Sequence, residues 1–164
     1  MSENYIMLNG KRVDLTEEQL EKLGLKVEIS KCFKLKFGAT YFFINSIGDV
    51  SKDKEGNVSY DTYRYNVANY CTDKKLMEQR ALHETLSRLL WRFSMQNDGD
   101  KIDWKGERRM KWCLYYNNSK EQFEISGNDS YKSLSVYFYN NEIAQRAIDE
   151  IVLPFMKEHP EFVW

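Results

Sequence analysis

Histidine, cysteine and acidic side chains are the residues of this chain that could carry catalysis or hold a metal. The only histidines are His83 and His159. A helix from Cys71 to His83 would separate their backbones by about 18 Å. Because zinc–ligand bonds are only about 2.0–2.3 Å long, these two side chains cannot share an ion on such a helix. We predict no metal site and no cofactor, and we interpret His83 as a boundary residue of a helix.

Three aspartates in the stretch QNDGDKIDW, Asp98, Asp100 and Asp103, offer oxygen atoms to Mg²⁺ or Ca²⁺. Their spacing misses the calcium-loop pattern, in which a glycine follows three alternating ligands and a glutamate comes six residues later. Asn-Asp-Gly after a long helical pattern is typical of a helix end. The sequence therefore favours a structural role for this stretch.

The sequence contains no recognisable nucleophilic centre. Cys71 precedes a predicted helix, whose dipole can lower a thiol pKa, but its position opposite Leu76 indicates a packed residue. The sequence has no Gly-x-Ser-x-Gly motif, no glycine-rich phosphate loop and no His-Glu-x-x-His motif. We favour a protein without catalytic activity, and an enzyme built from scattered residues stays open as a third hypothesis.

Cationic and aromatic side chains form two candidate binding groups. The first is a row at i, i+4 spacing, Arg80, Glu84, Arg88 and Arg92, for which a solvated face with a Glu–Arg pair is the structural alternative. The second precedes and enters a predicted strand and comprises Lys105, Arg108, Arg109, Lys111, Trp112, Tyr115 and Tyr116. Cations beside flat rings suit stacked single-stranded bases as well as a protein anchor. An ordinary polar loop leading into a core strand is the alternative.

Alternation along two predicted strands assigns the rings to faces. If Trp112, Leu114 and Tyr116 face the helices, then Tyr115 points away from them. In the predicted strand 134–139, the dry side takes Leu134, Val136 and Phe138. We therefore predict an aromatic patch on an open sheet face, where it would favour a partner. Its members are Tyr115, Tyr137 and Tyr139.

Length and composition indicate a single globular domain, residues 1–164. With 42% hydrophobic and 30% charged residues the chain can form a core. A net charge of −1 shows no basic excess of the kind that nucleic-acid binding usually needs. No hydrophobic run is long enough to span a bilayer. The three cysteines, Cys32, Cys71 and Cys113, indicate free thiols, so we expect a cytoplasmic protein.

The predicted fold is α+β, with antiparallel β meanders and two amphipathic helices. Residues 1–25 form a hairpin turning at Asn9-Gly10 and a helix 17–23, opened by a capping box of Thr16 and Gln19 and closed by Gly24. Two βββα units follow, at 32–96 and 110–158, which an internal duplication would explain. Their strands are expected near 33–37, 41–44, 63–67, 111–116, 122–126 and 134–139. The helices are expected at 73–96, capped by Thr72, and from Asn140 or Asn141 onwards, with Pro154 kinking or ending the last turn.

Three stretches resemble small proteins encoded by phages and prophages of Firmicutes. They are YNVANYCTDKKLMEQRALHETLSRLLWRFSMQNDGDKIDW, the tail IAQRAIDEIVLPFMKEHPEFVW and the opening NGKRVDLTEEQLEKLGL. The resemblance implies an accessory gene of a mobile element, a class that includes inhibitors of bacterial defence systems. It supplies no catalytic residues.

The sequence therefore supports two functional hypotheses. The first is a non-enzymatic accessory protein that binds and inhibits a host protein or ribonucleoprotein effector of defence, in the manner of an anti-CRISPR protein. The alternative is a nucleic-acid or nucleotide binder, either a single-strand binder or a sponge for a nucleotide signal. The ending Phe162-Val163-Trp164 either packs back on the domain or forms a contact between two copies.

Overall fold

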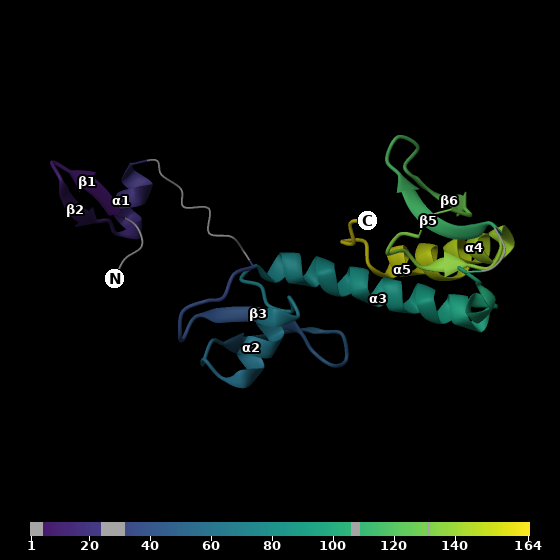
Figure 1. Cartoon of the computed structure of the whole chain (residues 1–164), viewed down its shortest axis with the longest axis horizontal. Coiled ribbons are helices and arrows are strands. Elements are labelled where there is room, and N and C mark those ends of the chain that lie inside the picture. Colours follow the sequence, from purple (N-terminus) through teal and green to yellow (C-terminus); the bar gives the residue numbers. More distant parts are fainter. Residues whose placement is uncertain (1–4, 24–31, 106–108, 131) are drawn as a thin grey trace.

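The computed structural model describes residues 5–23, 32–105, 109–130 and 132–164 (Figure 1). Helices and small antiparallel sheets make up these residues, so the predicted α+β class is confirmed. No described helix is long and apolar enough to cross a membrane.

The N-terminal unit contains the predicted hairpin. β1 (Tyr5–Leu8) and β2 (Lys11–Asp14) pair antiparallel. Asn9 and Gly10 between them have φ of 50° and 78°. A two-residue turn of the I′ type needs positive φ at both positions, which Asn-Gly tolerates well.

The predicted capping box opens α1 (Glu17–Lys22). The amide of Thr16 donates to Gln19 Oε1 at 2.8 Å, and the amide of Gln19 donates to Thr16 Oγ1 at 3.3 Å. Leu20 of this helix is buried. The predicted closing residue, Gly24, lies outside the described residues.

The first predicted βββα unit, residues 32–96, does not have the expected order of three strands before its helix. β3 (Thr40–Ile44) forms as expected, but its partner β4 (Val50–Lys54) lies in a stretch where no strand was expected. Asn45 closes the connection, because its side-chain oxygen accepts the amides of Ile47 and Asp49, each at 3.0 Å. This local turn allows a polar, weakly patterned sequence to pair as a strand.

The predicted strand 33–37 does not form. The amide of Leu35 donates to the hydroxyl of Tyr70 at 3.2 Å, and Gly38 turns the chain with a φ of 84°. The alternating Phe and Lys residues of 33–37 therefore belong to an irregular segment that contacts Tyr70, not to a strand.

The predicted strand 63–67 is also wrong, because α2 (Ser59–Asn66) occupies this region. The carboxylate of Asp61 accepts the amides of Gly56 at 2.8 Å and Val58 at 3.3 Å at the start of the helix. Such capping of the first turn outweighs the β preference of tyrosine-rich sequence.

The long helix α3 (Lys74–Gln96) forms as predicted, except that Asp73 rather than Thr72 caps it. The carboxylate of Asp73 accepts the amide of Leu76 at 3.1 Å. The helix ends at Asn97, and Asp98 follows in the left-handed conformation with a φ of 64°. Its end therefore falls where the Asn-Asp-Gly pattern predicts.

The second half contains a three-stranded sheet whose order is β6-β5-β7. β5 (Lys111–Asn117) and β6 (Gln122–Asn128) form the predicted hairpin. β7 (Tyr137–Phe138) is shorter than predicted and pairs with β5 rather than β6. The first half has two strands and two helices, so the halves differ in plan and the duplication is not confirmed.

The last helical segment is irregular next to Pro154, where a kink or an end was predicted. Asn140 caps α4 (Asn141–Ala147), a π-helical turn covers Ile148–Val152, and α5 (Leu153–Glu158) follows. Because Pro154 has no N–H, it cannot make the usual helical hydrogen bond. The wider turn just before it adapts the backbone to that loss.

α3 runs past β3 and then alongside α4 and α5 (Figure 1). It contributes side chains to two hydrophobic clusters. Its N-terminal half contributes Met77 and Ala81 to a small cluster with β3. Its C-terminal half packs into the main cluster, which the second sheet, α4 and α5 complete. The buried members from α3 are Leu86, Leu90 and Phe93.

Candidate functional site

The predicted arginine row on α3 is tied to one glutamate. Glu84 accepts Arg80 Nε at 2.9 Å and Arg88 Nη2 at 2.8 Å. Arg80 also donates to the carbonyl of Ala68, in the turn after α2. These pairs support the structural alternative for Arg80, whereas Arg92 is exposed one turn beyond Arg88.

The basic residues before β5 separate into different environments. Lys105 and Arg109 are exposed, and Arg109 Nη1 lies 3.4 Å from the hydroxyl of Tyr139. Lys111 is buried, with its Nζ 5.2 Å from the centre of the Trp104 ring. Arg108 lies outside the described residues.

The predicted patch of three tyrosines is not formed. Tyr115 is exposed, but its hydroxyl donates to Glu124 at the far end of the β5–β6 hairpin. Tyr137 is only 7% exposed, so the prediction that its ring is open to a partner is wrong. The ring of Trp104 packs edge-on against it, with centroids 4.8 Å apart. Tyr139 is half-buried.

The burial of Trp112 and Leu134 tests two other face assignments. Trp112 packs against the main core cluster, as predicted for a ring on the helix-covered face. Its ring is only partly buried there. Leu134 was assigned to the dry side but is fully exposed. It precedes β7, which starts only at Tyr137, so strand alternation does not apply to it.

Several predicted residues nevertheless converge around Trp104. We define the Trp104 surface as two adjoining hollows that share Ile102. An apolar hollow of about 430 Å³ lies between the C-terminal half of α3 and the segment before β7. A basic hollow of about 480 Å³ lies on the other side of Ile102, beside the start of β5.

The apolar hollow exposes large hydrophobic side chains. Trp91 on α3 is 59% exposed, and Met95 one turn later and Leu134 are exposed as well. Arg88 and Lys132 also line this hollow, and Lys132 Nζ lies 5.0 Å from the centre of the Trp104 ring. An aromatic and aliphatic centre with cations beside it is typical of a protein-binding surface.

The basic hollow has a different character. Its cationic lining residues are Lys101, Arg109 and Lys111, and Tyr139 supplies a ring. Lys101 Nζ pairs with Asp98 Oδ1 at 2.7 Å, and this contact raises the pKa of Lys101. The lysine therefore stays charged. Asp98 and Asp103 offset part of the positive charge, so the lining of this hollow is mixed and mainly cationic.

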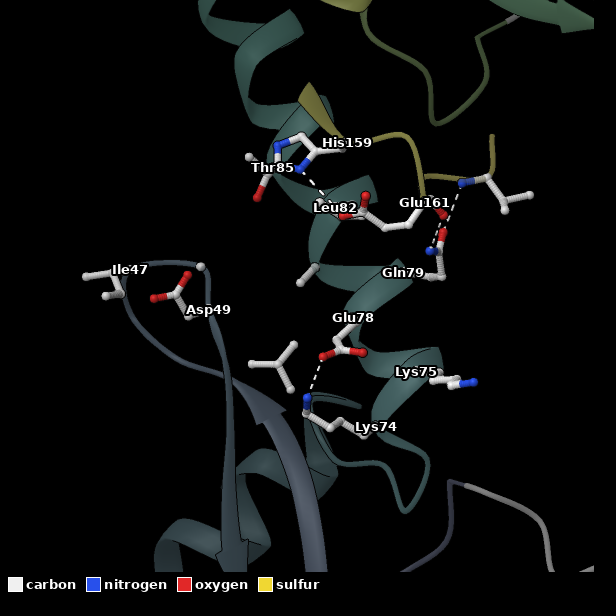
Figure 2. Close-up of a pocket in the computed structure, with 14 residues that line it drawn as sticks. Ile47, Asp49, Lys74, Lys75, Glu78, Gln79, Leu82, Thr85, His159 and Glu161 are labelled. Atoms are coloured by element: carbon white, nitrogen blue, oxygen red, sulfur yellow. Dashed lines mark hydrogen bonds and ion pairs between the residues drawn. The ribbon is translucent and has the colours of Figure 1, made fainter. Parts of the chain in front are cut away.

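Another hollow lies elsewhere and is shown in Figure 2. It has a volume of about 900 Å³ and lies between the N-terminal half of α3, the β3–β4 turn and the segment after α5. We call it the α3 groove. Ile47 on the turn is 80% exposed at its edge. None of the predicted binding residues that the structure describes lines it.

The polar residues of the α3 groove bind one another. Lys74 Nζ pairs with Glu78 Oε1 at 2.7 Å. Gln79 holds the C-terminal segment, because its Nε2 donates to the Glu161 carbonyl at 2.7 Å and its Oε1 accepts the Val163 amide at 2.9 Å. The groove is therefore built largely by contacts that fix the tail.

The C-terminal tail packs back on the domain, as one of the two predicted alternatives. Phe162 is buried in the main cluster and lies 5.5 Å from the Phe155 ring centre. Trp164 meets Phe123 of β6 edge-on at 4.8 Å. His83 on α3 is exposed, and its ring lies 4.7 Å from that of Phe162.

The described residues hold no cluster of three or more His, Cys, Asp or Glu side chains that could bind a metal. Asp103 accepts the amide of Lys105 at 2.7 Å, as a turn residue does. Cys71 is buried beside Ile44 and Met77, and burial raises the pKa of its thiol. Cys71 is therefore packed, as the sequence indicates, but Leu76, the partner expected for it, is 47% exposed.

Sequence reasoning missed Trp91, Trp104 and Lys132. Trp91 lies between the hydrophobic residues Leu90 and Phe93 of α3. Only knowledge of which side of the helix is buried shows that its side chain is exposed. Trp104 follows the aspartate stretch, where we looked for metal ligands. A tryptophan in a polar loop between a helix and a strand is the signal that could have drawn attention to this place.

Comparison with protein-family models, curated proteins and solved structures finds no match for this chain. The arrangement of its own residues is therefore the basis for a function.

Proposed function

We propose that this chain is a non-enzymatic accessory protein of a phage or prophage that binds and inhibits a component of bacterial defence. In this proposal it acts in the cytoplasm of the host and contacts its target through the Trp104 surface. The observation that carries the proposal is the exposure of Trp91 and Leu134 on either side of one hollow.

Exposed large side chains at a hollow favour a protein partner for a physical reason. Burying apolar area contributes about 25 cal/mol per Å², so a tryptophan that closes against a partner stabilises the complex substantially. Residues that contribute more than about 2 kcal/mol to binding are enriched in tryptophan and arginine. Trp91 and Arg88 line the same hollow, which places an anchor beside a cation.

The charge distribution supports contact by shape and anchors. The net charge of −1 gives no strong overall field. Lys132 lies beside the Trp104 ring, and Lys101 and Arg109 line the adjoining basic hollow. Local cations of this kind steer an acidic partner and set its orientation more than they raise affinity.

The test is phage plating on cells that carry a defence system and express this chain. We expect the wild-type chain to restore plaques against one system. The double variant Trp91→Ala and Leu134→Ser should lose this rescue, because it removes the anchors from an exposed surface without touching the core. The matched control is Ile47→Ser, which removes an exposed apolar residue from the α3 groove and should retain rescue.

Two outcomes count against the proposal. If Ile47→Ser abolishes rescue and the double variant does not, the α3 groove is the contact surface. If the wild-type chain rescues plating against no defence system, including RNA-guided nucleases, the inhibitory function itself is refuted.

The basic hollow favours a second candidate function, binding of a nucleic acid or nucleotide. Arg109, Lys111 and Tyr139 meet there, and cations beside a ring suit a phosphate and a stacked base. This function predicts binding that weakens steeply with salt, whereas anchoring by Trp91 and Leu134 does not.

A further inference from the structure

Two cysteines that are far apart in sequence lie in contact. Cys32 Sγ is 3.8 Å from Cys71 Sγ, although the residues are 39 positions apart. Both are free thiols, Cys32 exposed and Cys71 only 2% exposed. The third cysteine, Cys113, lies on β5.

Cys71 is held firmly in the body. Its backbone forms an isolated antiparallel bridge with Phe42 of β3: the Phe42 amide donates to the Cys71 carbonyl at 2.7 Å, and the Cys71 amide donates to the Phe42 carbonyl at 3.0 Å. The amide of Asp73 donates to its sulfur at 3.4 Å. This sulfur therefore has a fixed position and one backbone donor that stabilises a thiolate.

Cys32 begins the irregular segment that lies along the body. Side chains hold this segment: Leu35 donates its amide to Tyr70, and Lys34 Nζ lies 3.3 Å from Thr62 Oγ1. No described residue of 33–37 pairs in a sheet, so the segment can shift without breaking a ladder. A disulfide needs its sulfurs at about 2.05 Å, which a small shift of Cys32 provides.

We propose that Cys32 and Cys71 form a thiol–disulfide exchange site for small disulfides such as glutathione disulfide. The exposed Cys32 thiolate attacks one sulfur of the small disulfide, whose S–S bond breaks and releases one small thiolate. Cys71, after losing its proton to solvent, attacks the Cys32 sulfur and releases the second. Two protein thiols are oxidised, and one small disulfide is reduced to two thiols.

The difference in exposure between Cys32 and Cys71 sets the order of these steps. Burial raises the pKa of the Cys71 thiol, and the surrounding side chains shield it from a bulky reagent. Only a sulfur already attached to Cys32 can reach it at contact distance. Cys32 is therefore the entry residue and Cys71 the resolving residue.

The bond would close a covalent ring from residue 32 to residue 71. That ring includes β3, β4 and α2. A cross-link of this kind stabilises the fold chiefly by restricting the unfolded chain. Oxidation by small disulfides would then raise the stability of the segment from residue 32 to residue 71.

The experiment exposes the folded, reduced full chain to glutathione disulfide and follows the thiols by maleimide labelling, intact mass and peptide mapping. We expect loss of two of the three thiols, a mass lower by two hydrogens, and a linked pair of peptides containing Cys32 and Cys71. Cys113 should stay available to maleimide after mild unfolding, and dithiothreitol should restore all three thiols.

The variant Cys32→Ser changes only an exposed residue and serves as the test of the order. Its Cys71 thiol should be lost at least about tenfold more slowly than in the wild type, because access through Cys32 is gone. In Cys113→Ser, the Cys32–Cys71 bond should form as in the wild type. A stable glutathione adduct on Cys32 with Cys71 still reduced, or a bond from either residue to Cys113, would overturn the proposal.

Discussion

The indole of Trp104 lies edge-on against the phenol ring of Tyr137, with centroids 4.8 Å apart and ring planes at 83°. This contact covers the sheet face that strand alternation leaves open. Lys111 and Lys132 place their ammonium groups 5.2 and 5.0 Å from the centre of the same indole. Trp104 therefore holds the segment after α3 against β7 and organises the cations of the Trp104 surface.

Replacement of Trp104 by alanine should destabilise the fold by about 2 kcal/mol, because a half-buried ring, its aromatic contact and two cation–π contacts are lost together. Urea unfolding, followed by circular dichroism, measures the change. Trp91→Ala is the matched control, since its ring is exposed and its loss should cost under about 0.5 kcal/mol. Equal losses in the two variants would show that Trp104 is only a surface residue.

The second half of the fold could be predicted closely because its patterns are local. The hairpin of β5 and β6 and the cap of α4 each depend on neighbours in sequence. The burial of Tyr137 could not be predicted, since it depends on Trp104, which lies 33 residues earlier and belongs to no strand or helix. A face assignment from alternation states which side a residue is on, but not whether another segment covers that side.

The first half was harder because two local signals conflicted there. The sequence around Tyr63 and Tyr65 has a strand-like composition, yet Asp61 caps a helix through it. The contact between Cys32 and Cys71 was equally hidden, since it depends on how an irregular segment returns to the start of α3. Within the Trp104 surface, the sequence identified Arg88, Arg109, Lys111 and Tyr139 but neither of the tryptophans.

The buried carboxylate of Asp61 should make the packing of β3 against α2 sensitive to acid. Burial acts to raise the pKa of Asp61, but hydrogen bonds from the hydroxyl of Tyr41 at 2.7 Å and from backbone amides outweigh it, so the pKa is lowered. The stabilisation is therefore present above the unfolded pKa of about 3.9 and is lost as pH falls through the folded value. Asp61→Asn should cost about 2 kcal/mol at neutral pH.

Chemical unfolding of the wild type and Asp61→Asn between neutral and acidic pH tests this prediction. The difference in unfolding free energy should shrink as pH falls below about 4. Asp53→Asn is the control, because Asp53 pairs with Arg64 at 2.8 Å from an exposed position and should cost under about 1 kcal/mol. A difference for Asp61→Asn that stays constant with pH would contradict the assigned role of its charge.

Glu124 at the end of the β5–β6 hairpin should remain ionised at acidic pH values at which an ordinary glutamate is protonated. Hydrogen bonds from Lys120, and then from Tyr115 and two amide side chains, lower the pKa of Glu124 to about 2. Titration of its carboxyl carbon by NMR measures this value directly. Lys120→Met should raise the pKa most and Tyr115→Phe should raise it less. An ordinary pKa in the wild type would show that Tyr115 is free to serve a partner.

The C-terminal tail should contribute to stability within one copy of the chain. Phe162 is buried against Phe155, so Phe162→Ala should cost about 3 kcal/mol through lost burial and an unfilled cavity. Val163→Ala, at the exposed neighbouring position, should cost under about 0.5 kcal/mol. Thermal and urea unfolding at two protein concentrations measure both changes. A cost for Phe162→Ala that appears only at high concentration would assign the tail to a contact between copies.

Salt dependence separates the two candidate functions at the Trp104 surface. If the basic hollow binds single-stranded nucleic acid, the affinity for a labelled oligonucleotide should fall steeply with salt, and Arg109→Ala should lower the slope of log affinity against log salt by about one. Lys157→Ala removes an exposed cation from α5 and is the control that should leave the slope unchanged. Equal effects of the two variants would indicate diffuse attraction to the whole surface. Absence of binding at low salt would remove the oligonucleotide function and leave Trp91 and Leu134 as anchors for a protein.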